Sequence, residues 1–119
     1  MARQGQGPFR RQLLLDFGGT CCLSGCQIEC LLEAAHICTH DKSDDHARSN
    51  GLLLRADLHT LFDLNLLSID ADTFEVRLDT EVRLAAEYGV FHGRKLSIPQ
   101  MLRSGISAAM KKRAGQKRH

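Results

Sequence analysis

Three short segments decide the fold: residues 33–37 read Glu-Ala-Ala-His-Ile, residues 50–54 read Asn-Gly-Leu-Leu-Leu, and residues 58–63 read Leu-His-Thr-Leu-Phe-Asp. The first segment ends an apolar run of strand length, and the third places its leucine and phenylalanine residues at helical spacing. Residues 38–49 are polar and have no period, which predicts a loop. The leucines of the second segment fit either a strand or the start of a helix. The order of the segments favours strand, loop, strand and helix.

The polar residues of these segments have the chemistry that phosphodiester hydrolysis needs. The reaction requires a base that deprotonates water and an electrophile that stabilises charge on the phosphate and on the leaving oxygen. His36 can serve as the base because imidazole titrates near neutral pH. His59 and Asp63 are four residues apart in the predicted helix, so both side chains project from one face and can bind one divalent cation. A base on a strand opposite a metal ion on a helix leaves space for one phosphate.

These motifs, in this order, resemble the HNH nuclease family over roughly residues 10–78, with an extension toward Pro99. The resemblance implies an α+β fold with a ββα-metal (His-Me finger) core, flanking helices and an added β-hairpin. It also implies that His36 is the general base and that Asn50 holds the loop through hydrogen bonds and so orients His36. The expected catalytic residues are thus His36, Asn50 and His59, and the expected metal ligands are His59 and Asp63.

One position departs from the family pattern. Family members often have Asp or His directly before the base as a further metal ligand, whereas this chain has Ala35. Glu33 lies two residues earlier on the same strand face and is a candidate substitute ligand. Mixed nitrogen and oxygen donors suit several divalent ions. We expect one ion, Mg²⁺ or Mn²⁺ first, with Ni²⁺ or Zn²⁺ as alternatives.

Each of these residues also has a structural alternative. His36 could be a buried histidine at a strand end, and His59 could pack against Phe62. Asp63 could cap the helix or pair with an arginine. The loop beside the site is rich in His and Asp, and its side chains either contact the metal ion and substrate or are simply solvated; they are His40, Asp41, Asp44, Asp45 and His46.

Length and composition indicate one soluble domain. The chain has 119 residues, of which 43% are apolar and 25% are charged. No window has the roughly 18 uncharged apolar residues of a membrane span, and residues 1–7 lack the apolar stretch of a secretory signal. We therefore expect a cytoplasmic protein without a membrane partner. The expected parts are a flexible arm at residues 1–8, an HNH nuclease domain at 9–110 and a basic tail at 111–119.

Apolar spacing and turn residues predict further secondary structure. Asn65 follows the helix of the third segment and suits a left-handed cap. The expected elements are a helix at 9–17, short strands at 20–23 and 31–37 with a Ser24-Gly25 turn between them, a helix at 55–64, a hairpin of 66–69 with 74–78, a short helix at 81–88 and an amphipathic helix at 97–113.

Charge is distributed unevenly along the chain. Although the net charge is only +2, residues 103–119 contain no acid, and neither do residues 1–13. Basic ends on an acidic body indicate a polyanionic partner, and we expect DNA, bound in a salt-dependent way. Arg55 lies one helical turn before His59 and could reach a phosphate, or form a surface salt bridge instead. The other expected DNA-contacting residues are Lys111, Lys112, Arg113, Lys117 and Arg118.

The cysteines give a weaker signal. There are five, all in the first third of the chain: Cys21, Cys22, Cys26, Cys30 and Cys38. Their odd number argues against a complete disulfide framework, and their spacing does not form the paired sets of a zinc site. A structural zinc is therefore not expected. The Cys-Cys-Leu-Ser-Gly stretch at 21–25 matches a turn of the family in which a cysteine is a small buried packing residue.

The sequence thus predicts a metal-dependent HNH endonuclease that hydrolyses DNA. One alternative is a DNA-binding ββα module that has weak or no activity, which Ala35 favours. A second is a zinc domain that is organised by the cysteines and acts through protein contacts. A third is the nuclease part of a restriction or defence assembly, since a domain this small has limited surface for choosing a target. Protein partners or a homodimer remain open.

Overall fold

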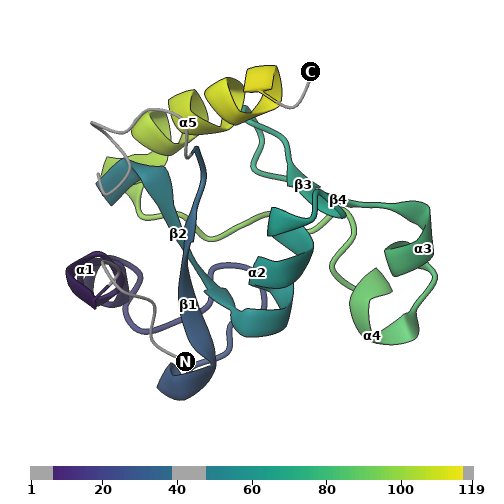
Figure 1. Cartoon of the computed structure of the whole chain (residues 1–119), viewed down its shortest axis with the longest axis horizontal. Coiled ribbons are helices and arrows are strands. Elements are labelled where there is room, and N and C mark those ends of the chain that lie inside the picture. The colour runs from purple at the N-terminus through teal and green to yellow at the C-terminus, as the bar shows by residue number, and fades with distance from the viewer. Residues whose placement is uncertain (1–6, 39–47, 117–119) are drawn as a thin grey trace.

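The computed structural model describes residues 7–38 and 48–116. This part of the chain contains both helices and strands, and it ends in a series of helices (Figure 1). The elements are α1 (Gly7–Asp16), η1 (Glu29–Leu31), β1 (Leu32–His36), η3 (Arg48–Asn50), β2 (Gly51–Arg55), α2 (Ala56–Asp63), β3 (Leu67–Ile69), β4 (Val76–Leu78), α3 (Thr80–Arg83), α4 (Ala86–Gly89), η4 (Gln100–Leu102) and α5 (Arg103–Gln116).

The core motif is the hairpin of β1 and β2 followed directly by α2. The strands are antiparallel, and His36 pairs with Gly51 while Glu33 pairs with Leu54. Residues 51–54 belong to β2 and are all buried, so the leucine run is a buried strand rather than the start of a helix. The helix ends where Asn65 adopts a positive φ of 62°, the left-handed cap that the sequence predicts. The α+β fold class with a ββα core is confirmed.

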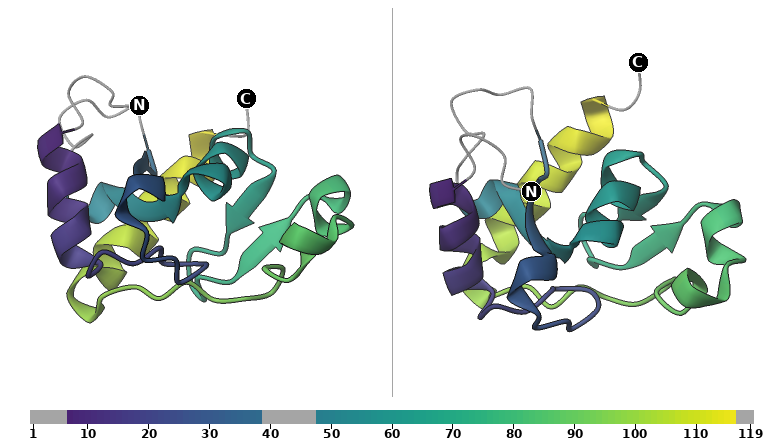
Figure 2. Two further views of the ribbon diagram at one scale, coloured as in Figure 1. Left: turned by 90° about the horizontal axis from the view of Figure 1, so that it is seen from below. Right: turned by 60° about the horizontal axis from the view of Figure 1, so that its bottom comes forward.

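The hairpin lies between two helices (Figure 2). Helix α1 packs on one side and α2 on the other. Gly51 makes the close approach of α1 to the hairpin feasible, because a Cβ atom there would lie 2.6 Å from Cζ of Phe9. Helix α1 begins at Gly7 rather than at Phe9, so Pro8 lies in its first turn. Proline lacks a backbone N–H, but the N–H groups of the first turn have no partner within the helix, so no helical hydrogen bond is lost.

The predicted strand at residues 20–23 is wrong, because this segment forms a turn. The Sγ atom of Cys21 accepts hydrogen bonds from the backbone N–H of Ser24 at 3.3 Å and of Arg55 at 3.3 Å. The buried thiol thus closes the turn and connects it to the end of β2. The partner of β1 is therefore β2, which follows it in the chain, and not the segment before it.

A second hairpin extends the domain beyond the ββα core. Strands β3 and β4 pair antiparallel, as the alternating pattern predicts, with Leu67 opposite Leu78. The single helix expected at 81–88 is instead two short helices, α3 and α4, separated by Leu84 and Ala85. They lie at the end of the molecule farthest from α1 (Figure 1).

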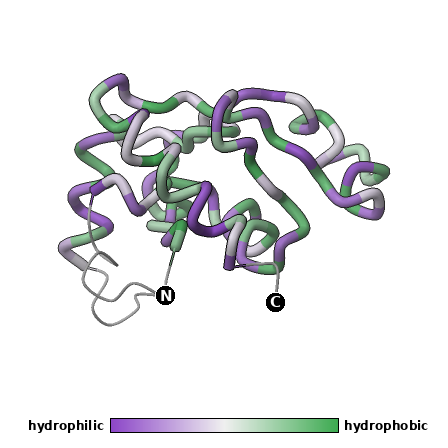
Figure 3. The backbone as a smooth tube through the Cα atoms, turned by 90° about the horizontal axis from the view of Figure 1, so that it is seen from above, coloured by the Kyte–Doolittle hydropathy of each residue, from purple (hydrophilic) through white to green (hydrophobic). Residues whose placement is uncertain are grey.

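The terminal helix α5 packs against η3, the short helix that directly precedes β2. Gly105 lies so close to Ser49 that a Cβ atom would be 2.5 Å from the serine Cβ, and Ile106 and Met110 are buried. The helix continues to Gln116, so position 111, the expected start of a basic tail, lies inside it. Hydrophilic and hydrophobic residues alternate in short stretches along the backbone (Figure 3). Within the described ranges, no helix has both the length and the apolar character to cross a membrane.

Candidate active site

His59 lies between two carboxylates. Its Nδ1 atom is 2.7 Å from Oε1 of Glu33 on β1, and its Nε2 atom is 3.1 Å from Oδ2 of Asp63, one helical turn further along α2. The imidazole is buried, with 4% of its side chain exposed, whereas Asp63 is 50% exposed. The helix thus presents a buried nitrogen donor beside an oxygen donor that solvent can reach.

The Nε2–Asp63 pair fits a divalent ion. Two ligands that bind at about 2.1 Å and subtend about 90° at the ion lie about 3.0 Å apart, close to the observed 3.1 Å. A proton on Nδ1 that is donated to Glu33 leaves the Nε2 lone pair facing Asp63. Two acceptors at this distance repel each other unless a proton or a cation lies between them, so the pair is suited to share a metal ion.

Glu33 occupies the other side of the imidazole from Asp63. The sequence suggests Glu33 as a substitute for the ligand that Ala35 cannot provide. The observed contact does not match this interpretation, because the Glu33 carboxylate lies beside Nδ1 of His59 whereas Asp63 lies beside Nε2. Ala35 is fully buried. Glu33 and Asp63 thus lie on different sides of the His59 ring. In agreement, residues 7–38 and 48–116 contain no cluster of three or more His, Cys, Asp or Glu that could hold a metal ion.

Asn50 ties the two ends of the loop together. Its buried amide accepts a hydrogen bond from the backbone N–H of Cys38 at 2.9 Å and donates one to the carbonyl oxygen of Cys38 at 2.7 Å. The backbone N–H of Ile37 donates to the carbonyl oxygen of Asn50 at 3.0 Å. Only an amide side chain provides a donor and an acceptor in this arrangement. Asn50 therefore fixes the chain immediately after His36.

His36 packs against α1. Its ring stacks on Phe9, with the centroids 4.4 Å apart and the planes inclined by 13°, and its Nε2 atom is buried. Alternate side chains of a strand point to opposite faces, so His36 faces α1 while Glu33 faces α2. The structure thus brings Glu33, His59 and Asp63 together, and it directs the His36 side chain to the other face of β1.

Arg55 is paired with Asp57 at the start of α2. Nε and Nη2 of Arg55 donate to the two carboxylate oxygens at 2.7 and 3.0 Å, and the hydroxyl of Tyr88 donates to Oδ2 at 2.7 Å. These hydrogen bonds, from Arg55 first and then Tyr88, lower the pKa of Asp57 to about 2, against the opposing effect of burial. Of the two roles considered for Arg55, the salt bridge is the one present.

Arg113 connects α5 to both parts of the candidate site. Its Nη1 donates to the carbonyl oxygen of Ile37 at 2.9 Å, and its Nη2 donates to the carbonyl oxygen of Phe62 at 2.6 Å and to Oδ1 of Asn65 at 3.2 Å. The guanidinium also lies over the Phe62 ring, 3.7 Å from its centroid. Burial lowers the pKa of Arg113, and the charge of Asp63 opposes this shift. Arg113 was expected on a solvated DNA-contacting tail, and instead it is part of the packed domain.

The remaining basic residues of the tail are placed differently. Nζ of Lys111 lies 3.5 Å from Oδ1 of Asp72. Both side chains are exposed, and an exposed ion pair of this type contributes little to stability. Lys112 is exposed on α5. Lys117 and Arg118 lie outside the described residues, as do the His and Asp residues of the loop at positions 40, 41 and 44–46.

The described cysteines are all free thiols. Cys21, Cys22 and Cys38 are buried, Cys26 is partly buried and Cys30 is exposed. Burial, with the neighbouring Cys21 adding to its effect, raises the pKa of the Cys22 thiol well above its ordinary value. This thiol is therefore protonated at neutral pH and packs as a small apolar group.

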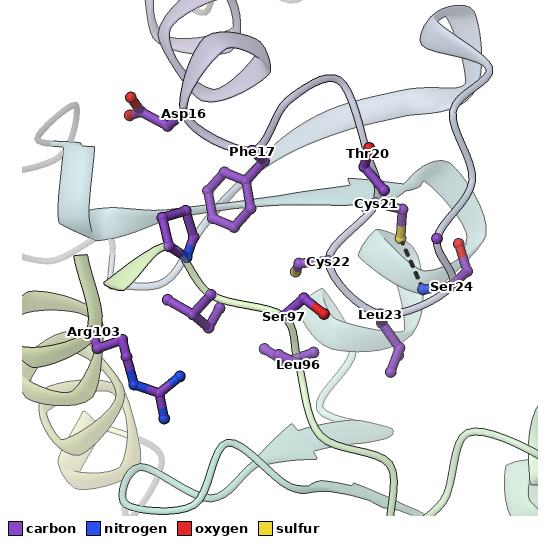
Figure 4. A pocket seen from close by; sticks show the side chains of 13 residues that line it. Asp16, Phe17, Thr20, Cys21, Cys22, Leu23, Ser24, Leu96, Ser97 and Arg103 are labelled. Carbon is purple, nitrogen blue, oxygen red and sulfur yellow. Dashed lines mark hydrogen bonds between the residues drawn. The ribbon is translucent and has the colours of Figure 1, made fainter. Parts of the chain in front are cut away.

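A surface pocket lies away from the site (Figure 4). It is bordered by the end of α1, the 21–25 turn and the segment before α5, with Asp16 and Arg103 among its lining residues. The closing hydrogen bond from Ser24 to the Cys21 thiol lies at its edge. None of His36, Asn50, His59 or Asp63 lines it.

Comparison with known protein families finds a match over the ββα core. Residues 21–70 match the model of a family described as HNH endonuclease. The matched range contains β1, β2, α2 and β3, and therefore both halves of the candidate site. None of the curated proteins matches the chain. This match supports the HNH family recognised from the three sequence motifs, and it covers residues 21–70 of the chain.

Proposed function

We propose that the protein is a metal-dependent endonuclease that hydrolyses phosphodiester bonds in DNA. The observation that carries the proposal is the His59–Asp63 pair, whose donor atoms lie 3.1 Å apart on α2, next to a hairpin that carries His36 at the end of its first strand. The match of residues 21–70 to a family described as HNH endonuclease supports a nuclease. Residues His59 and Asp63 would hold one divalent ion, with Mg²⁺ or Mn²⁺ suited to the carboxylate.

His36 is the general base of the proposed reaction. Because Nε2 is buried, Nδ1 is the ring nitrogen that takes the proton from the attacking water. The water oxygen forms a bond to phosphorus and the bond from phosphorus to the 3′ oxygen breaks. The 3′ oxyanion then takes a proton from solvent, so the products carry a 5′ phosphate and a 3′ hydroxyl. When bound, the divalent ion supplies electrostatic stabilisation of the charge on the phosphate and on the leaving oxygen.

Asn50 and Glu33 support this chemistry without contacting the phosphate. Asn50 fixes both backbone groups of Cys38, two residues after His36, and so orients the base. Oε1 of Glu33 lies 2.7 Å from Nδ1 of His59; in the tautomer with the proton on Nδ1, this nitrogen donates a hydrogen bond to Glu33 and the Nε2 lone pair is directed toward Asp63. Carboxylates that orient ligand histidines in this way are widespread in metal sites.

The stacking of Phe9 on His36 favours a second candidate function. If the stack held the base away from substrate, the domain would bind DNA without cleaving it, as the buried Ala35 in place of a third ligand would also favour. Nicking of supercoiled plasmid in a series of Mg²⁺, Mn²⁺, Ni²⁺ and Zn²⁺ distinguishes the two. Cleavage in any of these metals supports the endonuclease, and DNA retention with no cleavage in all of them supports the binding module.

A further inference from the structure

Arg113 forms one bridge between the strand that carries the base and the helix that carries the metal ligands. Ile37, whose carbonyl oxygen binds Nη1, directly follows His36. Phe62, whose carbonyl oxygen binds Nη2, directly precedes Asp63. The two nitrogens belong to one rigid guanidinium, so the end of β1 and the end of α2 lie within the span of a single planar group.

The chemistry of this contact is specific to arginine. The last carbonyl groups of a helix lack partners within the helix, and a cation there is favoured by the helix dipole. A guanidinium offers several donors in a fixed planar arrangement and can also stack on an aromatic face. Arg113 uses all of these properties at once, with the Phe62 carbonyl, the Ile37 carbonyl and the Phe62 ring as partners. A lysine ammonium also has several donors, but it lacks the planar spacing between them and cannot stack on the Phe62 ring in the same way.

We infer that Arg113 is a positioning residue, which sets the distance and orientation between His36 and the His59–Asp63 pair. The inference rests on the proposed function for its catalytic consequence. It assigns to α5 a role in the site even though the helix lies outside residues 21–70, the range that matches the family model. Because His36 and Glu33 face opposite sides of β1, the alignment of the strand end with the helix end decides whether base and metal ligands act on one phosphate.

The chain offers a matched control for the loss of this bridge. Arg10 on α1 donates from Nε to the carbonyl oxygen of Leu32 at 3.1 Å and from Nη2 to that of Glu29 at 2.9 Å. It is also an arginine that joins two backbone carbonyl groups, but at the start of β1, away from His36. Comparing Arg113→Met with Arg10→Met therefore separates two effects: the loss of a bridge at this particular position, and the general loss of stability when any such bridge is removed.

The first test is amide hydrogen exchange of the two variants, which needs neither metal nor substrate. The N–H of Cys38 follows Ile37 and is bonded to Asn50, and the N–H of Asn65 donates to the carbonyl oxygen of Phe62. We expect both amides to exchange at least about tenfold faster in Arg113→Met than in Arg10→Met. Equal exchange in the two variants would overturn the bridge, whatever the activity.

The second test is the single-turnover rate of plasmid nicking at saturating DNA and Mn²⁺. We expect Arg113→Met to lose about 100-fold in rate with DNA affinity within about twofold, Arg113→Lys to recover only part of the loss, and Arg10→Met to keep its rate. Weaker DNA binding at an unchanged rate would make Arg113 a phosphate contact instead. Equal rate losses in both methionine variants would reduce it to a stability residue. Wild-type protein without cleavage would contradict the proposed function, while hydrogen exchange would still decide the bridge.

Discussion

Oε1 of Glu33 lies 2.7 Å from Nδ1 of His59, on the opposite side of the ring from Asp63. A strand residue therefore determines which nitrogen of a helix residue is directed toward the carboxylate of Asp63. This relationship gives a role to a glutamate that sequence reasoning could treat only as a replacement ligand. In the proposed function, this contact would order the two ligands of the site before a metal ion binds.

The Glu33–His59 contact predicts a graded response to substitution. Glu33→Ala removes the acceptor for Nδ1, so Mn²⁺ affinity measured by calorimetry is expected to fall about 10- to 100-fold. Glu33→Gln keeps a carbonyl acceptor and should lose much less. In ¹⁵N spectra, the His59 ring of the wild type should carry its proton on Nδ1, and this preference should disappear in Glu33→Ala.

The control for these variants is Glu81→Gln, which removes an exposed carboxylate of α3. Its metal affinity should equal that of the wild type. A Glu33→Ala variant that binds Mn²⁺ as tightly as Glu81→Gln does would show that Glu33 has no part in the metal site.

Asn50 predicts a large loss of stability when its amide is removed. Asn50→Ala leaves the buried N–H and carbonyl groups of Cys38 without their partner, which should lower the free energy of unfolding by about 2–4 kcal/mol. Urea denaturation measures the change. Gln27→Ala removes an exposed hydrogen bond to Thr20 and serves as the control, with an expected change within about 0.5 kcal/mol. Similar values for the two variants would contradict the role of Asn50 in closing the loop.

The Asp57 carboxylate predicts part of the acid sensitivity of the fold. Its pKa lies at about 2, below its ordinary value of 3.8, so its contribution to stability is complete above pH 3.8 and disappears as the pH falls through 2. We expect Asp57→Asn to lower stability at pH 6 by about 1 kcal/mol, a value discounted for partial exposure, and to flatten the pH dependence between pH 4 and pH 2. Denaturation at several pH values tests this, with exposed Asp79→Asn as the control. An unchanged acid slope in Asp57→Asn would be the contrary result.

The ββα core could be predicted because its signals are local. The leucine and phenylalanine spacing of the helix, the left-handed Asn65 and the alternation of the second hairpin each depend on neighbouring residues, and all three are present. The motifs also identified the segment that matches the HNH family. Local pattern failed at residues 20–23, where an apolar run forms a turn. There the Cys21 thiol accepts a hydrogen bond from Arg55, 34 residues away, and strand propensity contains no information on such a contact.

The arrangement of side chains around the site could not be predicted, because it depends on contacts between residues that are even farther apart in the chain. Arg113 in a run of basic residues resembles a solvated tail, yet its bond to Ile37 joins residues 76 apart in the chain. The stacking of Phe9 on His36 likewise requires α1 to pack on the hairpin, which Gly51 makes feasible. Spacing alone could place His59 and Asp63 on one helix face, but it could not show which ring nitrogen Glu33 binds.

The most direct test of the central claim is nicking of supercoiled plasmid DNA in Mn²⁺ by the wild type and by His36→Ala, with circular dichroism and DNA retention measured on the same samples. We expect that the wild type nicks the plasmid and that His36→Ala loses nearly all of this activity while its fold and DNA binding persist. Equal nicking by the two proteins would contradict the assignment of His36 as the base.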